Sequence, residues 1–283
     1  MPELPEVEVL ARHLAPLVRG RKISTTQILR PKVLRPTTPV EFNRVLAGAT
    51  FSTLTRRGKY LLFQLRAKNG APLVLVGHLG MTGRMYLSSA KVPLPKHAAV
   101  VLHLGRENFI YEDTRYFGRL TLDTSSIAAL GPEPWAKEFT AENFAAALKN
   151  SAQPIKVKLL DQSVVAGVGN IYASEALYRA GISPRLAARR LKPAQVVRLR
   201  RAIRQTLADA IKRGSTIPLN YGGAGGRDGL FYFGRLPDAP DYYAERLQVY
   251  DRAGQPCRQC ETPIKRLVQA ARSTFYCPTC QRG

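Results

Sequence analysis

The stretch GVGNIYASEALYRAG (167–181) decides much of the fold, because it joins a glycine turn to the start and end of a helix. Two glycines allow a tight turn before Asn170, and Gly181 is a typical helix stop, so we predict a helix between them. Backbone N–H groups and the helix dipole at Asn170 suit a phosphate, and Lys156 and Lys158 lie on the preceding helix. An ordinary turn between two helices is the alternative interpretation.

Helical patterns continue on both sides of this stretch. Thr140 is placed to cap one helix, residues 154–164 predict a second short helix, and residues 193–212 predict a long one. The long segment begins with proline and repeats apolar residues on one face, namely Val196, Leu199, Ile203, Leu207 and Ala210. The glycine-rich residues 214–236 are predicted to form a long loop, either functional or a plain connector.

The N-terminal half consists mostly of short β-type runs, which predict an antiparallel sandwich or barrel. Examples are KISTTQIL (22–29), ATFSTLTRRG (49–58), KYLLFQL (59–65), APLVLVGHL (71–79), AAVVLHL (98–104) and RLTLDT (119–124). One helix precedes them, with apolar residues at helical spacing from Val7 to Val18 and a stop at Gly20. The stretch LGPEP (130–134) is the predicted hinge to the helical half.

The cysteines form two pairs near the C-terminus, Cys257-x2-Cys260 and Cys277-x2-Cys280, which is the four-thiolate zinc pattern. Four thiolates complete a tetrahedral shell and leave no position for water. We therefore predict one structural Zn²⁺. A zinc-held hairpin would present the basic residues between the pairs to phosphates, or leave them as a solvated face: Lys265, Arg266 and Arg272.

The opening residues MPELPEVE (1–8) are a second candidate site. A Met before a small residue is normally trimmed, and trimming leaves Pro2 with a free secondary amine. An α-amine has a reference pKa of about 7.7–8, so a useful fraction is neutral at physiological pH. Such an amine can attack C1′ of a sugar and form an iminium, with Glu3 and Glu6 as general acid and orienting group. A plain helix start is the alternative.

Charge narrows the class of partner. The chain has 283 residues, with 43 Lys plus Arg against 20 Asp plus Glu and a formal net charge of +23. That excess favours a polyanion, because each cation docked on a phosphate releases a counterion. A ribosomal or membrane-surface protein is the alternative. No apolar run approaches the ~18 residues that a spanning helix needs, so we expect no membrane anchor and a cytoplasmic location.

Together and in this order, these signals resemble the formamidopyrimidine-DNA glycosylase family, whose sister branch is endonuclease VIII. The matching stretches extend over essentially the whole chain: PELPEVE (2–8), RRGKYLL (56–62), HLGMTG (78–83), DTRYFG (113–118), IKVKLLDQSVVAGVGNIYASEAL (155–177) and RSTFYCPTCQ (272–281). The resemblance implies an α+β fold. Residues 1–130 would form a catalytic antiparallel β-sandwich with a leading helix, 131–236 a helix-two-turn-helix domain with the lesion loop, and 237–283 a zinc-finger hairpin.

The resemblance also implies an activity and a set of catalytic residues. The protein would be a monomeric, nucleoid-associated repair enzyme that removes 8-oxoguanine and formamidopyrimidines from damaged double-stranded DNA. It would then cut the strand by β- and δ-elimination. Pro2 would be the nucleophile and Glu3 the general acid. Glu6 would help to order the site, and Lys59 would contact the phosphate backbone near the lesion.

Two groups of DNA contacts are implied as well. The residues that would hold the strand are Lys156, Asn170, Tyr172 and Arg272. The residues that would fill the gap left by the flipped nucleotide are Met81, Arg115 and Phe117. For Met81 and Phe117, taken without the resemblance, core packing is the alternative.

Some positions depart from the family pattern. His97 lacks its usual paired histidine because Ala99 stands there, which puts a phosphate contact from His97 in doubt. Tyr116 replaces a common second arginine, and the loop at 222–229 is unusual in detail. PELPEVE and the wedge residues favour the purine branch. An endonuclease VIII-like enzyme for oxidised pyrimidines, a non-catalytic lesion-binding protein and, more distantly, a zinc-ribbon ribosomal protein are the alternatives.

Overall fold

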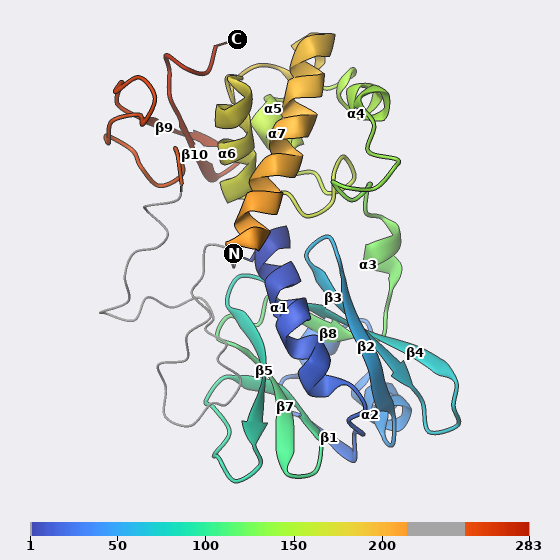
Figure 1. Cartoon of the computed structure of the whole chain (residues 1–283). Helices are drawn as coiled ribbons and strands as arrows, with labels where there is room; N and C mark the ends of the chain where they lie inside the picture. The colour runs from blue at the N-terminus through green and yellow to red at the C-terminus, as the bar shows by residue number, and fades with distance from the viewer. Residues whose placement is uncertain (1, 214–246, 283) are drawn as a thin grey trace. The chain divides into compact units, whose positions relative to one another are not determined.

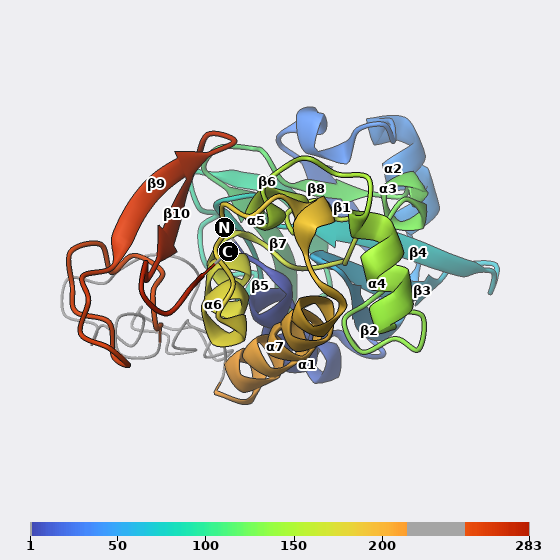
Figure 2. The same ribbon diagram turned by 90° about the horizontal axis from the view of Figure 1, so that it is seen from above.

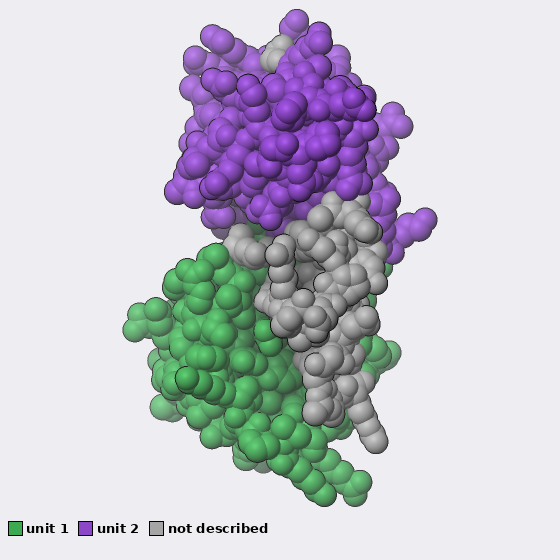
Figure 3. Space-filling view, turned by 90° about the vertical axis from the view of Figure 1, so that its left-hand side faces the viewer, with its two compact units in different colours: residues 1–2, 6–128, 217–238 green, residues 3–5, 129–216, 239–283 purple. Residues whose placement is uncertain are grey.

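The computed structural model describes residues 2–213 and 247–282. The predicted loop at 214–236, including 222–229, lies outside the described residues. By its internal contacts the chain divides into two units, which Figure 3 distinguishes by colour. Of the described residues, unit 1 comprises residue 2 and residues 6–128, and unit 2 comprises residues 3–5, 129–213 and 247–282. Among the described residues, no helix is long and apolar enough to cross a membrane.

Unit 1 contains two antiparallel 4-stranded sheets (Figure 1), with the strand orders β1-β6-β7-β5 and β2-β3-β4-β8. The strands of the first sheet are β1 (Thr25–Ile28), β5 (Gly83–Ser89), β6 (Ala98–His103) and β7 (Glu107–Asp113). Those of the second are β2 (Thr50–Arg57), β3 (Tyr60–Arg66), β4 (Pro72–His78) and β8 (Arg119–Thr121). The other elements are α1 (Leu4–Val18), η1 (Pro31–Leu34), α2 (Pro39–Leu46) and α3 (Ser125–Ala128).

The two sheets share one core. In β3, buried side chains alternate with half-buried ones, as expected for a strand with one face inward. The ring of Phe63 lies 5.9 Å from Phe51 in its own sheet and 5.3 Å from Phe109 in the other sheet, between ring centroids. The same cluster takes in apolar residues of α1, including Leu10 and Leu14. The predicted sandwich with a leading helix is therefore confirmed.

In the residues that the structure describes, unit 2 is helical apart from one hairpin. Its helices are α4 (Ala141–Leu148), α5 (Ile155–Lys158), α6 (Asn170–Ala180), η2 (Ala188–Arg190) and α7 (Pro193–Lys212). Helices α6 and α7 pack against each other (Figure 1), and their apolar faces form the core of the unit. The predicted bounds of the long helix are confirmed at both ends. Gly181 adopts φ +66°, the left-handed conformation that ends α6 as expected.

The predicted helix at 154–164 is wrong in length, because α5 stops at Lys158. The cause lies in the side chain of Asp161, which accepts hydrogen bonds from the Ser163 backbone N at 3.0 Å and from Lys158 Nζ at 2.8 Å. A carboxylate that satisfies the backbone two residues further on stabilises a turn in place of further helix. The glycine turn at residues 167–169 comes next in the chain and leads into α6.

The hairpin of unit 2 consists of β9 (Lys265–Gln269) and β10 (Arg272–Tyr276), and β10 lies against α6 (Figure 2). The buried carboxylate of Glu175 on α6 fixes the chain that leads to this hairpin. It accepts hydrogen bonds from the backbone N atoms of Gln248, Val249 and Tyr250, each at 2.9 Å. Burial raises the pKa of Glu175, while these three N–H groups act in the opposite direction.

We expect Glu175→Gln to lower the free energy of unfolding by about 2 kcal/mol, because an amide has one acceptor oxygen and leaves buried N–H donors unpaired. Urea denaturation followed by circular dichroism measures the loss. Glu138→Gln, at an exposed site in the same unit, is the matched control and should unfold like the wild type. Equal unfolding midpoints for the two variants would contradict this role of Glu175.

Candidate functional site

The N-terminus of α6 is bound by a carboxylate of the chain itself. Glu3 is buried, and its Oε1 and Oε2 accept hydrogen bonds from the backbone N of Ile171 at 2.8 Å and of Tyr172 at 3.3 Å. The sequence indicates that this helix end suits a phosphate, and in the structure two of its N–H groups bind Glu3. A carboxylate is equally suited to N–H groups at the positive end of a helix dipole.

The glycine pair of the GVGN turn is explained by this contact. A Cβ atom on Gly169 would lie 2.3 Å from Cδ of Glu3, and one on Gly167 would lie 2.5 Å from a methyl carbon of Leu4. Gly167 also has φ +91°, a conformation that L-residues rarely adopt. The turn therefore has two requirements, a backbone conformation and close approach of the N-terminal segment. Only glycine meets both.

Pro2 is joined to Glu3 by one peptide bond, so chain connectivity alone keeps the proline nitrogen near that carboxylate. In unit 1, Glu6 on α1 is buried, and Lys59 lies in the turn between β2 and β3 with only 9% of its surface exposed. Lysine is rarely buried to this extent without a functional or structural reason.

The positive charge of Lys59 affects the pKa of His78, at the end of β4. Burial, together with the nearby charges of Lys59 and Arg119, lowers the pKa of His78 to about 4. His78 is therefore neutral at physiological pH. Its Nδ1 accepts a hydrogen bond from the Gly80 backbone N at 3.1 Å, which helps to shape the turn before Met81.

The structure brings together the three predicted wedge residues of unit 1. Met81 is 41% exposed and Phe117 is 50% exposed, so core packing does not explain them. Arg115 lies between them, with Nη1 3.4 Å from Met81 Sδ and its guanidinium carbon 4.6 Å from the Phe117 ring centroid. His97 is half-buried near Tyr116, with ring centroids 6.5 Å apart, and the usual partner position is occupied by the core residue Ala99.

A second group forms in unit 2 between α5, α6 and the hairpin. Lys156 is fully buried and donates to Asn170 Oδ1, and Asn170 Nδ2 donates to the Ser273 backbone O at 2.9 Å. Burial and nearby Arg272 lower the pKa of Lys156, Glu3 acts in the opposite direction, and the net pKa is about 8. Lys156, Asn170 and Arg272 therefore lie in one neighbourhood.

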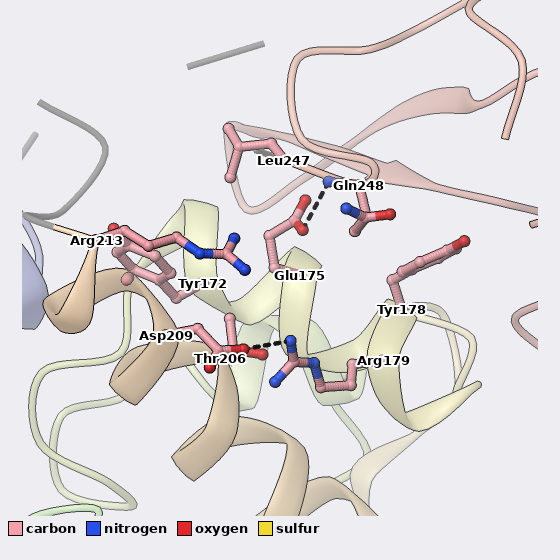
Figure 4. A pocket seen from close by; sticks show the side chains of 10 residues that line it. Tyr172, Glu175, Tyr178, Arg179, Thr206, Asp209, Arg213, Leu247 and Gln248 are labelled. Atoms are coloured by element: carbon pink, nitrogen blue, oxygen red, sulfur yellow. Dashed lines mark hydrogen bonds and ion pairs between the residues drawn. The ribbon is translucent and has the colours of Figure 1, made fainter. Parts of the chain in front are cut away.

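Tyr172 lies apart from the group of Lys156, Asn170 and Arg272. Its side chain is buried and lines a cavity of about 270 Å³ between α6 and α7 (Figure 4). The charged groups there are engaged with the protein. Glu175 binds the backbone at Gln248, and Arg179 Nη2 lies 2.6 Å from Asp209 Oδ2. The cavity is thus part of the helix packing, and Tyr172 is the one predicted site residue that lines it.

The four cysteines meet the geometric test for zinc. Their Sγ atoms all lie within 4.8 Å of one another, and a tetrahedral site with Zn–S bonds of about 2.3 Å needs S···S distances of about 3.8 Å. A disulfide is excluded, because its sulfurs would be about 2.05 Å apart. Cys257 and Cys280, in contrast, are 3.9 Å apart. The four cysteines therefore fit one structural Zn²⁺.

Sequence reasoning missed two residues near these groups. Tyr178 on α6 lies with its hydroxyl 3.2 Å from Cys257 Sγ, a contact between residues too distant in sequence for any local signal. Asp113 is fully buried at the end of β7 and accepts from the Arg115 backbone N at 3.1 Å. An Asp two residues before its backbone partner is a known turn pattern, so this residue had a local signal.

Comparison with known proteins agrees with this geometry. Family models match for the formamidopyrimidine-DNA glycosylase N-terminal domain at residues 1–120, its H2TH domain at 130–220, and the zinc finger found in FPG and IleRS at 254–283. The chain is 42% identical to a formamidopyrimidine-DNA glycosylase of Symbiobacterium thermophilum, over 99% of this chain and 89% of the relative.

Solved structures give the same result. MutM in complex with DNA containing carbocyclic 8-oxo-G superposes with a TM-score of 0.85 at 33% identity, with both chains covered in full at 100%. Lactococcus lactis Fpg in complex with Fapy-dG DNA gives a TM-score of 0.85 at 32% identity, covering 99% of this chain and 100% of that one. The chain belongs to the formamidopyrimidine-DNA glycosylase family.

Proposed function

We propose that this protein excises oxidised purines, 8-oxoguanine and formamidopyrimidines, from damaged duplex DNA and then cleaves the strand at the abasic site. The observation that carries the proposal is the Glu3 carboxylate, held at the N-terminus of α6 directly after Pro2. The relatives bound to 8-oxo-G and Fapy-dG DNA support the purine substrate. The pyrimidine-specific alternative is not favoured, because the similar curated relatives are named formamidopyrimidine-DNA glycosylases.

We assign the chemistry to Pro2, acting after Met1 has been removed. Its neutral nitrogen forms a bond to C1′ as the bond from C1′ to the base breaks; the electron pair leaves with the base, and the base takes up the proton that the proline nitrogen loses. Glu3 gives a proton to the sugar ring oxygen, so that the ring opens to an iminium. Loss of the 3′ phosphate by β-elimination and the 5′ phosphate by δ-elimination then opens the strand, with no oxidant or reductant. Glu6 helps to order the site, and Lys59 contacts the phosphate backbone near the lesion.

The remaining predicted residues are assigned to holding and opening the duplex. Lys156, Asn170 and Arg272 hold the strand, and the exposed Met81, Arg115 and Phe117 fill the gap left by the flipped nucleotide. We assign catalysis to residues 1–130, strand binding to 131–236 and the zinc hairpin to 237–283. His97, with its half-buried ring, and Tyr172, with its buried side chain, complete the assigned DNA contacts.

The zinc supplies structure. When bound by Cys257, Cys260, Cys277 and Cys280, it holds the hairpin that carries Arg272. One copy of the chain engages one lesion in double-stranded DNA. Because the substrate is chromosomal DNA, we propose that the enzyme works at the nucleoid in the cytoplasm.

Borohydride should trap a covalent protein–DNA adduct on a duplex with 8-oxoguanine opposite cytosine, because reduction fixes the iminium on Pro2. Gel mobility and intact mass measure the adduct, and the mass also shows that Met1 is absent. Pro2→Gly should give much less adduct. Binding without an adduct in the wild type would indicate a lesion-binding protein, and equal trapping by Pro2→Gly would exclude the assigned nucleophile.

Glu3→Gln should slow base release roughly 10²- to 10⁴-fold, the usual contribution of a general acid. Trapping at a preformed abasic site should fall less, because the abasic sugar already equilibrates with an open-chain aldehyde and does not depend on Glu3 to open the ring. Single-turnover kinetics on the two duplexes compare the steps. Glu41→Gln, at an exposed site on α2, is the control and should match the wild type. An equal loss in both assays would mean that Glu3 serves the fold alone.

DNA affinity should fall as the pH rises above about 8, because a phosphate binds the charged form of Lys156, whose pKa lies near that value. The fall from one such group is at most about tenfold per pH unit. Fluorescence anisotropy between pH 6.5 and 9.5 measures it. Lys156→Arg keeps its charge over this range and should remove the dependence; if the variant and the wild type give the same pH profile, another group is responsible.

A further inference from the structure

We propose that the buried carboxylate of Asp113 is the positioning residue that locks the Met81 turn and the Arg115–Phe117 turn into one rigid wedge. The inference rests on the proposed function, because it assumes that these side chains enter the duplex. Asp113 is not among the predicted catalytic residues or the predicted DNA contacts. Asp113 does not touch DNA in this proposal and acts only through the residues it holds.

Asp113 joins two turns that are distant in sequence. Its Oδ1 accepts from Thr82 Oγ1 at 2.6 Å and from the Arg115 backbone N at 3.1 Å. Its Oδ2 accepts from the Gly118 backbone N at 2.9 Å and from the Tyr111 hydroxyl at 3.3 Å. Thr82 directly follows Met81, Arg115 is itself a wedge residue, and Gly118 directly follows Phe117. The Asp113 carboxylate therefore binds Arg115 itself and the residues that directly follow Met81 and Phe117.

The backbones of the two turns also touch. A Cβ atom on Gly80 would lie 2.5 Å from the Gly118 backbone N, and one on Gly118 would lie 2.1 Å from the Tyr111 hydroxyl. Gly80 has φ +62°, and Tyr116 in the second turn has φ 52°, so both turns use the left-handed conformation. Turns packed this closely cannot shift independently of each other.

A carboxylate suits this position because all four partners are donors. Ionised Asp accepts hydrogen bonds at both oxygens and donates none, whereas Asn would direct an NH₂ group at two of the donors. Burying a charge is costly unless it is well hydrogen-bonded, and here it is. The contacts from Arg115 to Met81 and Phe117 exist only while both turns hold their places. A wedge that must unstack a base pair has to be stiff, so this fixation bears directly on flipping.

Two variants test the proposal. Thr82→Val removes one donor and keeps the shape of the side chain, and Asp113→Asn disrupts two contacts. The first assay follows 2-aminopurine placed opposite an abasic-site analogue in a duplex, whose fluorescence rises when a wedge displaces it. The second measures kcat/KM for excision of 8-oxoguanine from duplex DNA. The third measures borohydride trapping on a single-stranded abasic oligonucleotide, where no base pair has to be opened.

We expect Thr82→Val to reduce duplex excision about tenfold and Asp113→Asn to reduce it about a hundredfold, from the usual effect of losing hydrogen bonds to a charged group. Both should reduce the fluorescence rise, and both should leave single-strand trapping unchanged. Thr37→Val is the matched control: it removes a buried hydroxyl of the same unit, bonded to Thr121 Oγ1 at 2.8 Å. It should match the wild type in all three assays.

Two results would overturn the proposal. The first is a fluorescence rise in both variants equal to that of Thr37→Val. The second is an equal loss of duplex excision and single-strand trapping in Asp113→Asn, which would mean a general role in folding. If the wild type excises nothing, the proposed function fails. The fluorescence assay needs no catalysis and decides the role of Asp113 on its own.

Discussion

The contact between the Glu3 carboxylate and the first N–H groups of α6 is the constraint on which the candidate site depends. It attaches the start of the chain to a helix that begins at Asn170. A free N-terminus is normally mobile, and a mobile amine would lose the advantage of being held beside its substrate. Because Glu3 is fixed, the residue bonded to it has a limited range of positions. The glycines at 167 and 169 follow from the same contact, since any side chain there would displace the N-terminal segment.

A similar device recurs at three places in the described part of the chain. Glu3, Asp113 and Glu175 are buried carboxylates, and each accepts two or more hydrogen bonds from backbone N–H groups. In a protein with net charge +23, salt bridges would be the more obvious partners. Using backbone donors has a consequence for function. A cation paired with an internal carboxylate is less available to a phosphate, whereas an N–H group carries no such competing role.

The sequence predicts most of the fold because the signals for its elements are local. Pro193 and the apolar spacing define α7, Gly181 ends α6, and the cysteine spacing predicts the metal site. Local patterns fail where a side chain redirects the backbone, as Asp161 does at the end of α5. They also could not identify the ligand of the α6 N-terminus. A helix end shows only that an anion fits there, and the anion is supplied from 168 residues earlier in the chain.

Helix α6 explains why a structural zinc matters to residues that never touch it. The Asn170 side chain at its start binds the backbone O of Ser273, Glu175 in its middle binds residues 248–250, and the Tyr178 hydroxyl near its end contacts Cys257. The segment from residue 248 to the hairpin is thus fastened to α6 at three points along the helix, and the four thiolates lie on either side of the hairpin strands. Since Arg272 is adjacent to Ser273, the geometry that holds the zinc also places a guanidinium beside Lys156. In the proposed function, a bound zinc would act on the strand-holding residues through this chain of contacts, while its complete thiolate shell would keep it out of the chemistry.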